Sequence, residues 1–136
     1  MNNCTTLPRT LVNALLQQAQ LGGGQEICGL IAAKDGQAQG CYPIPNTAAQ
    51  PQTRYTMDPA SQIRALRDMR ENNEELFAIY HSHPSSPAEP STTDILEASY
   101  PEALYLIISL NTKGVLEIRG FRIQQGKSDE VELVIE

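Results

Sequence analysis

The stretch LFAIYHSHP, residues 76–84, organises this chain, because an apolar run leads directly into two histidines and a proline. A short apolar run of this kind is typical of a buried strand. Residues two apart in an extended chain point to the same face, so His81 and His83 are predicted to share one face. Pro84 also favours an extended backbone at His83. The two imidazoles are therefore predicted to converge on one metal ion.

A metal centre needs a further ligand, since the chain has only two histidines. Catalytic zinc usually takes three protein ligands and keeps a fourth position for water. Asp94 follows His83 across the proline-rich segment 84–90 and is expected in the first turn of a helix. A carboxylate oxygen beside two imidazoles suits zinc. We therefore predict one zinc ion per chain, held by His81, His83 and Asp94.

Asp94 also has a simpler interpretation. Residues 91–94 read STTD, which matches a helix capping box, in which residues three apart satisfy free backbone N–H groups. Taken alone, this pattern favours capping over ligation. The two histidines just upstream reverse that balance, although as a pair without Asp94 they are equally compatible with ordinary loop histidines.

Glu26 is a further candidate, because it stands at the start of a predicted strand over residues 26–33 that is otherwise apolar. An acid that enters such a strand is costly unless it lies at the edge or has a function. Locally, a solvated residue after a glycine turn is the more common case. Cys28 would share a face with Glu26, and we interpret it as a small core residue, since nothing marks its thiol as activated.

Helices and strands are expected in a mixed order around this stretch, which indicates a layered α/β fold of one domain over residues 1–136. Asp35-Gly36 is a hairpin signal, and prolines at 43 and 45 suggest that the strand before them lies at a sheet edge. The expected helices are 6–20, one starting at Asp58-Pro59, and 91–99, and the expected strands are 26–33, 38–44, 76–80, 105–110, 115–123 and 131–135.

Composition excludes several classes of function. The 136 residues carry a formal net charge of −6, and the densest basic stretch, Arg64, Arg67 and Arg70, is interpreted as a solvated helix face. Nucleic acid is therefore not an expected partner. No apolar run is long enough for a membrane span, and the N-terminus lacks the features of a signal peptide. Three cysteines at no metal or redox spacing suggest a reducing compartment, so a cytoplasmic location is expected.

Taken together, these residues resemble a known family. Glu26 with residues 28–30, then residues 81–84, then Ser91 and Asp94, are similar to the JAMM metalloprotease signature, also called MPN-plus or JAB. Asn46 and residues 55–59 add weaker likenesses. The resemblance spans about residues 7–121, and its histidine-to-aspartate block is highly specific. It implies a cytidine-deaminase-like αβα sandwich with a mixed sheet, although the deaminase motifs themselves are missing.

The resemblance also implies a mechanism and a substrate. Glu26 resembles the general base of the family and Ser91 the residue that hydrogen-bonds the developing oxyanion. The compact chain resembles the stand-alone prokaryotic members, which implies cleavage after the C-terminal Gly-Gly of a ubiquitin-like or sulfur-carrier protein. A non-catalytic scaffold of the MPN type and a DNA-associated role like that of the RadC group stay as alternatives, and the oligomeric state is left open.

Overall fold

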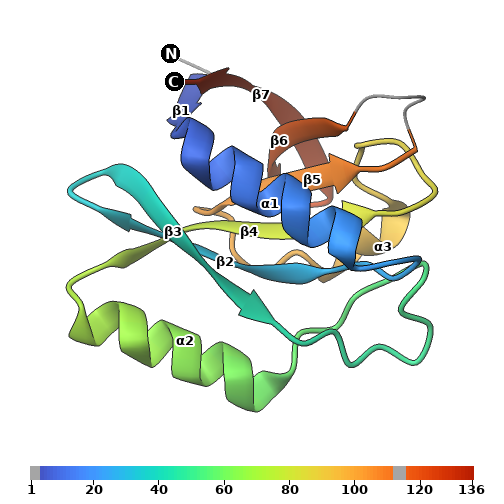
Figure 1. The fold of residues 1–136 in the computed structure, drawn as a ribbon, viewed down its shortest axis with the longest axis horizontal. Helices are drawn as coiled ribbons and strands as arrows, with labels where there is room; N and C mark the ends of the chain where they lie inside the picture. Colours follow the sequence, from blue (N-terminus) through green and yellow to red (C-terminus); the bar gives the residue numbers. More distant parts are fainter. Residues whose placement is uncertain (1–3, 112–115) are drawn as a thin grey trace.

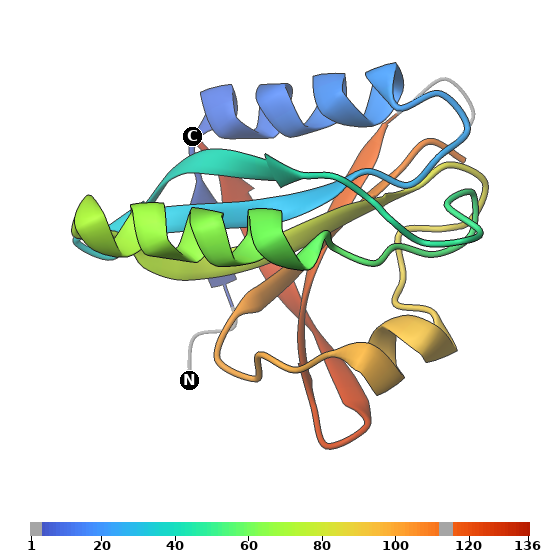
Figure 2. The same cartoon turned by 90° about the horizontal axis from the view of Figure 1, so that it is seen from below.

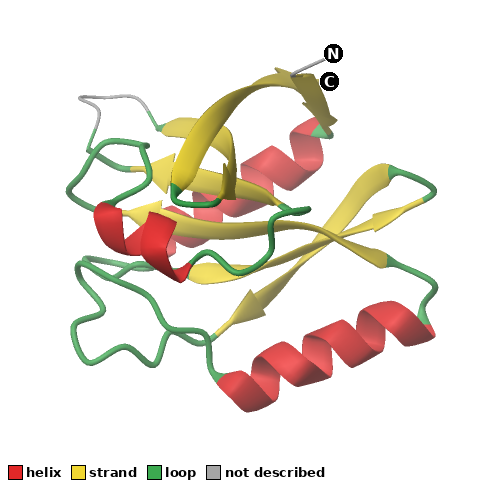
Figure 3. Cartoon of the chain, turned by 180° about the vertical axis from the view of Figure 1, so that it is seen from behind, coloured by secondary structure: helices red, strands yellow, loops and turns green. Residues whose placement is uncertain are grey.

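The computed structural model describes residues 4–111 and 116–136. In these residues the strands form one mixed, twisted sheet in the order β1-β7-β6-β5-β4-β2-β3 (Figures 1 and 3). The β4–β5 and β1–β7 pairs are parallel, and the other neighbours are antiparallel. The strands are β1 (Cys4–Leu7), β2 (Cys28–Lys34), β3 (Gln37–Ile44), β4 (Glu75–His83), β5 (Leu104–Ser109), β6 (Glu117–Gln124) and β7 (Lys127–Ile135).

Helices cover both faces of this sheet. Helix α1 (Arg9–Leu21) buries its apolar stripe in one hydrophobic cluster, and α2 (Pro59–Glu71) buries Ala65 and Met69 in another. Side chains of β4 alternate between these clusters, with Ala78 and Tyr80 in the first and Ile79 in the second. Figure 2 shows the strands lying between α1 and the short helix α3 (Thr92–Glu97). The predicted α/β architecture, with helices on both faces of a mixed sheet, is therefore confirmed.

The predicted Asp35-Gly36 hairpin is confirmed, since both residues have positive φ, as a tight two-residue turn requires. The strand that ends in prolines, β3, lies at an edge of the sheet as expected. Three details differ from the sequence predictions. β1 includes residues 6 and 7, which were expected in the first helix. β4 continues through His83, beyond the expected end at Tyr80. β6 turns into β7 at Gln125-Gly126, so both strands extend into the gap expected between the strands 115–123 and 131–135. The expected start of β6 at Val115 lies outside the described residues.

The sheet closes the long sequence gap between Glu26 and the histidines. β2 and β4 run antiparallel with Cys28 opposite His81. Just before β2, Ile27 exchanges hydrogen bonds with Ser82, since its N–H donates to Ser82 Oγ at 2.9 Å and its carbonyl accepts from Ser82 N at 3.0 Å. Glu26 is thereby held beside the end of β4, where the chain then turns towards α3.

None of the helices in residues 4–111 and 116–136 combines the length and the apolar character needed to cross a bilayer.

Candidate metal centre

His81 and His83 end β4 with both rings on one face of the sheet, as the sequence predicts. The two Nε2 atoms lie 3.0 Å apart, and both residues are almost completely buried. The His83 ring is fixed by its other nitrogen, because Nδ1 donates to the carbonyl of Pro87 at 2.7 Å. A neutral His83 then has its lone pair on Nε2, which faces His81. Outer hydrogen bonds of this kind are what orients a histidine that binds a metal.

Asp94 lies in the first turn of α3 and brings its Oδ2 to the same point. This oxygen is 3.1 Å from His81 Nε2 and 3.2 Å from His83 Nε2. It also accepts a hydrogen bond from the Ser91 N–H at 2.9 Å, and the Asp94 N–H donates to Ser91 Oγ at 3.0 Å. The capping box and the cluster with the histidines therefore exist together. The two interpretations of Asp94 are compatible.

The electrostatics of these three donors call for a cation. Burial by itself would raise the pKa of Asp94, but hydrogen bonds from His81 and His83 bring it well below its usual range. The hydrogen bond from His83 requires a proton on Nε2 as well as on Nδ1, and although burial opposes this charge, the contacts with Asp94 and the Pro87 carbonyl raise the pKa of His83. In the neutral ring a lone pair on Nε2 would face the carboxylate instead, which is repulsive unless a metal ion lies between them. Burial lowers the pKa of His81, so its charged form is disfavoured.

The donor set fits zinc. Two imidazoles and a carboxylate are common ligands of catalytic zinc, with bonds of about 2.0–2.2 Å. In a tetrahedron with bonds of about 2.0–2.1 Å, neighbouring donors lie about 3.3–3.4 Å apart. The observed 3.0–3.2 Å separations fall within a few tenths of an ångström of that edge. Small shifts of the three side chains would complete the geometry.

Glu26 is the other acidic group at this point. Its carboxylate and the donor atoms of His81 and His83 all lie within 4.8 Å of one another, so it is a competing third ligand on proximity alone. Asp94 is the better ligand, because its oxygen lies at 3.1 and 3.2 Å from the two nitrogens. Glu26 is then left beside the three donors without being needed as a ligand.

The Glu26 side chain is held in an unfavourable environment. It is only 3% exposed, and among the described residues its Oε1 has no hydrogen-bond partner. Burial raises its pKa from 4.5 to about 7, His83 opposes this, and the negative charge of Asp94 adds to it. A carboxyl group with a pKa near 7 is suited to accept and return protons at neutral pH. The solvated alternative for Glu26 is wrong, since the side chain is buried.

Asn46 holds the backbone that carries Glu26. Its Nδ2 donates to the carbonyls of Glu26 at 3.0 Å and Arg54 at 3.1 Å, and its Oδ1 accepts from the N–H groups of Ala48 and Thr56, both at 3.0 Å. One amide therefore joins the segment before β2 to the loop before α2. In the sequence, Asn46 was noted only as part of the family resemblance, and the structural role of this residue was not predicted.

Tyr55, one residue before Thr56, extends this support to the histidines. Its ring stacks on His81 with centroids 4.4 Å apart. This contact holds the His81 ring in place. The ring needs such support, because its Nδ1 is buried without a hydrogen-bond partner in the described residues. Sequence reasoning did not assign Tyr55 a role, because its partner lies 26 residues away in the chain.

Ser91 stands at the exposed N-cap of α3, beside the cluster. Its Oγ accepts from the Asp94 N–H, which leaves the hydroxyl proton free to donate to another group. The preceding loop is well anchored, since Ser109 Oγ donates to the carbonyl of Ser86 at 2.8 Å and Ala88 is fully buried. A donor is therefore presented at a fixed place next to the candidate metal centre.

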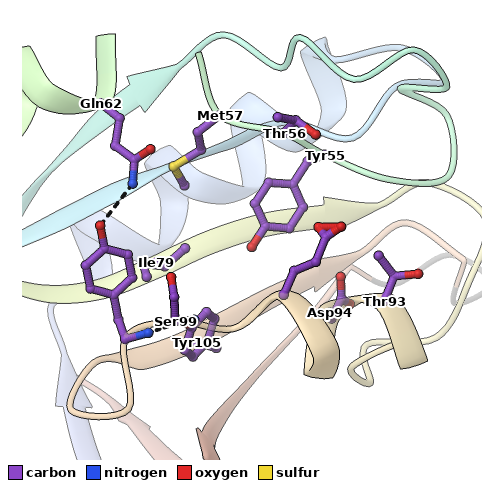
Figure 4. Close-up of a pocket in the computed structure, with 11 residues that line it drawn as sticks. Tyr55, Thr56, Met57, Gln62, Ile79, Thr93, Asp94, Ser99 and Tyr105 are labelled. Carbon is purple, nitrogen blue, oxygen red and sulfur yellow. Dashed lines mark hydrogen bonds between the residues drawn. The ribbon is translucent and has the colours of Figure 1, made fainter. Parts of the chain in front are cut away.

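A cavity of about 210 Å³ opens next to Asp94. Its walls come from the Tyr55–Met57 segment, the first turn of α2, α3 and the start of β5 (Figure 4). Gln62 and Asp94 lie on opposite sides, and Gln62 Nε2 donates to Tyr100 OH at 3.1 Å. Asp94 contributes to both this cavity and the cluster with His81 and His83, whereas the two histidines do not line the cavity.

Known proteins are similar to this chain in sequence. The family model for prokaryotic homologs of the JAB domain matches residues 8–123. The chain is 35% identical to the CysO-cysteine peptidase of Mycobacterium tuberculosis over 88% of its own length and 83% of that protein. It is 41% identical to a probable TtuB-protein conjugate cleaving protease of Thermus thermophilus over 68% of its own length and 57% of that protein.

Solved structures show the same fold. A solution structure of a protein from Desulfitobacterium hafniense matches with a TM-score of 0.85 and 33% identity, over 96% of this chain and 92% of the other. A crystal structure of a JAB1/MPN domain protein from Archaeoglobus fulgidus matches with a TM-score of 0.61 and 17% identity, over 96% and 99% of the two chains, which shows the fold alone. The expected JAB/MPN architecture is therefore confirmed.

Proposed function

Since the chain belongs to the family of prokaryotic homologs of the JAB domain, we propose that it is a zinc-dependent peptidase or isopeptidase. Its substrate is a ubiquitin-like or sulfur-carrier protein, and the bond hydrolysed follows the C-terminal Gly-Gly of that carrier. The observation that carries the proposal is the convergence of His81, His83 and Asp94 beside the buried carboxyl of Glu26, whose Oε1 has no hydrogen-bond partner among the described residues.

His81, His83 and Asp94 would hold the zinc ion through two Nε2 atoms and Oδ2. When bound, zinc supplies Lewis acidity, which polarises a carbonyl oxygen and makes a water molecule a stronger acid. Glu26 accepts a proton from the attacking water and returns it to the leaving amine, a role that its pKa of about 7 suits. Ser91 donates a hydrogen bond from its free hydroxyl to the carbonyl oxygen as negative charge develops there.

The substrate class is supported by the names of the relatives. One is named for CysO-cysteine and another for conjugates of a protein named TtuB. These two names imply different groups attached to the carrier. We therefore propose only that the leaving group is an amine, and we do not assign which residue carries it. An extended carrier tail would pair with an exposed sheet edge. β3 offers such an edge, and its last residue, Ile44, lies opposite Cys28, two positions from Glu26.

Other features bear on the cellular location and on the two alternative functions. Cys4, Cys28 and Cys41 are all free, which fits a cytoplasmic location. A scaffold without activity has no need for a buried carboxyl next to three converging donors. A DNA-associated role finds little support in a net charge of −6.

The test uses a ubiquitin-like carrier from the same genome with one cysteine added after its Gly-Gly, and mass spectrometry of the products. We expect the wild type to release the cysteine, a chelator to stop the reaction, and added zinc to restore it. Glu26→Gln is the matched control, and it should keep zinc while its turnover falls about 10²–10⁴-fold. Hydrolysis that persists after complete removal of metal would contradict the proposal, and zinc binding without any hydrolysis would favour the scaffold.

A further inference from the structure

The last residue of β5, Ser109, is a buried serine beside the candidate metal centre. β5 pairs with β4 in parallel (Figure 1), and Ser109 is the register partner of His83. None of its surface is accessible to solvent, so its hydroxyl needs partners within the chain. Its Oγ donates to the carbonyl of Ser86 at 2.8 Å and accepts from the Asn111 N–H at 3.1 Å. The hydroxyl therefore joins the end of β5 to the loop between β4 and α3.

The Ser86 carbonyl lies one residue before the carbonyl that fixes His83. The carbonyl of Pro87 accepts from His83 Nδ1 at 2.7 Å and from the Glu89 N–H at 2.8 Å. Ser109 and His83 thus hold consecutive carbonyls of the loop, each from the end of a neighbouring strand. The proline ring fixes φ of Pro87, so only one soft dihedral, ψ of Pro87, separates these two carbonyls. A displacement of the first is therefore passed on to the second.

Other contacts tie this loop to the sheet less firmly. Residues 85–87 are exposed, although Ala88 is fully buried in the same hydrophobic cluster as Ile107. Burial of a methyl group places the loop but does not orient its carbonyls. Arg119 Nη1 lies 3.5 Å from Glu89 Oε1, but the glutamate side chain is largely exposed and such pairs contribute little. Among the described residues, Ser109 is thus the buried side chain other than His83 that anchors the loop by a hydrogen bond.

From this pair of hydrogen bonds we infer that Ser109 is a positioning residue of the metal centre. It holds the Ser86 carbonyl, and thereby keeps the Pro87 carbonyl where it receives the Nδ1–H of His83. The bond at Nδ1 in turn directs Nε2 of the same ring towards His81 and Asp94. Outer partners of a metal-binding histidine typically change metal affinity 10–100-fold. The inference rests on the metal centre of the proposed function.

The first measurement is the zinc affinity of Ser109→Ala, obtained by chelator competition on the whole chain. Alanine keeps the backbone of the strand but leaves the Ser86 carbonyl without its donor. We expect zinc to bind about tenfold more weakly, the lower end of the effect of an outer partner, because Ser109 acts through the loop. A zinc affinity equal to that of the wild type would overturn the inference.

The matched control is Ile108→Val, one residue earlier on the same strand. Ile108 is also fully buried, but its side chain lies in the other hydrophobic cluster, with α1 and without the loop. The change removes one methylene from the core and lowers stability without removing a hydrogen bond. It should leave the zinc affinity unchanged. An equal loss in this control would mean that general loosening of β5 weakens the site, and the positioning role would be wrong.

A second measurement separates this inference from the proposed function. The chain has only two histidines, so NMR can follow the Nδ1–H proton of His83 in the metal-free protein. This proton should exchange slowly with water in the wild type and in Ile108→Val, and markedly faster in Ser109→Ala. If the wild type binds no zinc, the proposed metal centre fails, and the exchange rates alone decide the role of Ser109. Equal rates in the wild type and Ser109→Ala, or equal acceleration in Ile108→Val, overturn the inference whether or not zinc binds.

Discussion

Glu26→Gln should stabilise the metal-free protein while it disables the enzyme. The substitution keeps the shape of the side chain but removes a carboxylate that is buried without a partner for Oε1. Burial raises the pKa of Glu26 from 4.5, its value in an exposed chain, to about 7. The folded state therefore holds a proton that the unfolded chain has already lost between pH 4.5 and 7.

The sign and the size of the effect on the free energy of unfolding follow from the difference between the folded and unfolded pKa values of Glu26. A folded-state pKa above the unfolded one means that the free energy of unfolding decreases as pH rises from 4.5 to about 7. The difference of about 2.5 pH units, at 1.36 kcal/mol each, gives a cost on the order of 3 kcal/mol above pH 7. Glutamine carries no charge, so Glu26→Gln does not incur this cost. Below pH 4.5 the two proteins should be equally stable.

The assay is urea unfolding of wild type and Glu26→Gln in the presence of a chelator, at several pH values from 4 to 8. The free-energy difference should grow from near zero to a few kcal/mol in favour of the variant. A variant that is less stable than wild type at pH 8, or a difference independent of pH, would refute the reasoning. In that case Glu26 would contribute to stability, and its proposed role as a base would lose its physical support.

Three further predictions concern the other site residues. The purified protein should hold about one zinc per chain, and the His81→Ala/His83→Ala double variant, confirmed as folded by circular dichroism, should hold none. Asp94→Asn should still accept the Ser91 N–H and lose at most about 1 kcal/mol of stability, but its zinc affinity measured by chelator competition should fall sharply. Ser91→Ala should keep zinc, lose about 0.5–2 kcal/mol of stability, and turn over about 10²–10³-fold more slowly. Unchanged zinc binding in Asp94→Asn would leave that residue as a cap alone, and normal turnover of Ser91→Ala would remove its role towards the oxyanion.

Local sequence patterns were enough to predict the centre of the fold. The alternation around His81 and His83 depends only on the geometry of one strand, and the Asp35-Gly36 turn depends only on two residues. The second hairpin was missed because Gln125 has positive φ, which glutamine rarely adopts, so only Gly126 marked the turn. β1 was missed because four residues acquire their structure from β7, at the other end of the chain.

The environment of the site could not be predicted in the same way. The burial of Glu26 depends on the exchange of hydrogen bonds between Ile27 and Ser82, 55 residues apart. The role of Asn46 depends on four partners in three separate segments. Such contacts follow from the register of β2 on β4 and from the path of the loop before α2. A single sequence contains no signal for either.

One oxygen atom, Oδ2 of Asp94, belongs both to the first turn of α3 and to the proposed zinc centre. Local folding of this six-residue helix and retention of the ion are then a single linked equilibrium, since an ion that binds only the wound form stabilises that form by mass action. Short helices open far more often than the strands that carry the histidines. If zinc binds there, transient unwinding of this helical turn would offer a route for its release that does not require the whole domain to unfold.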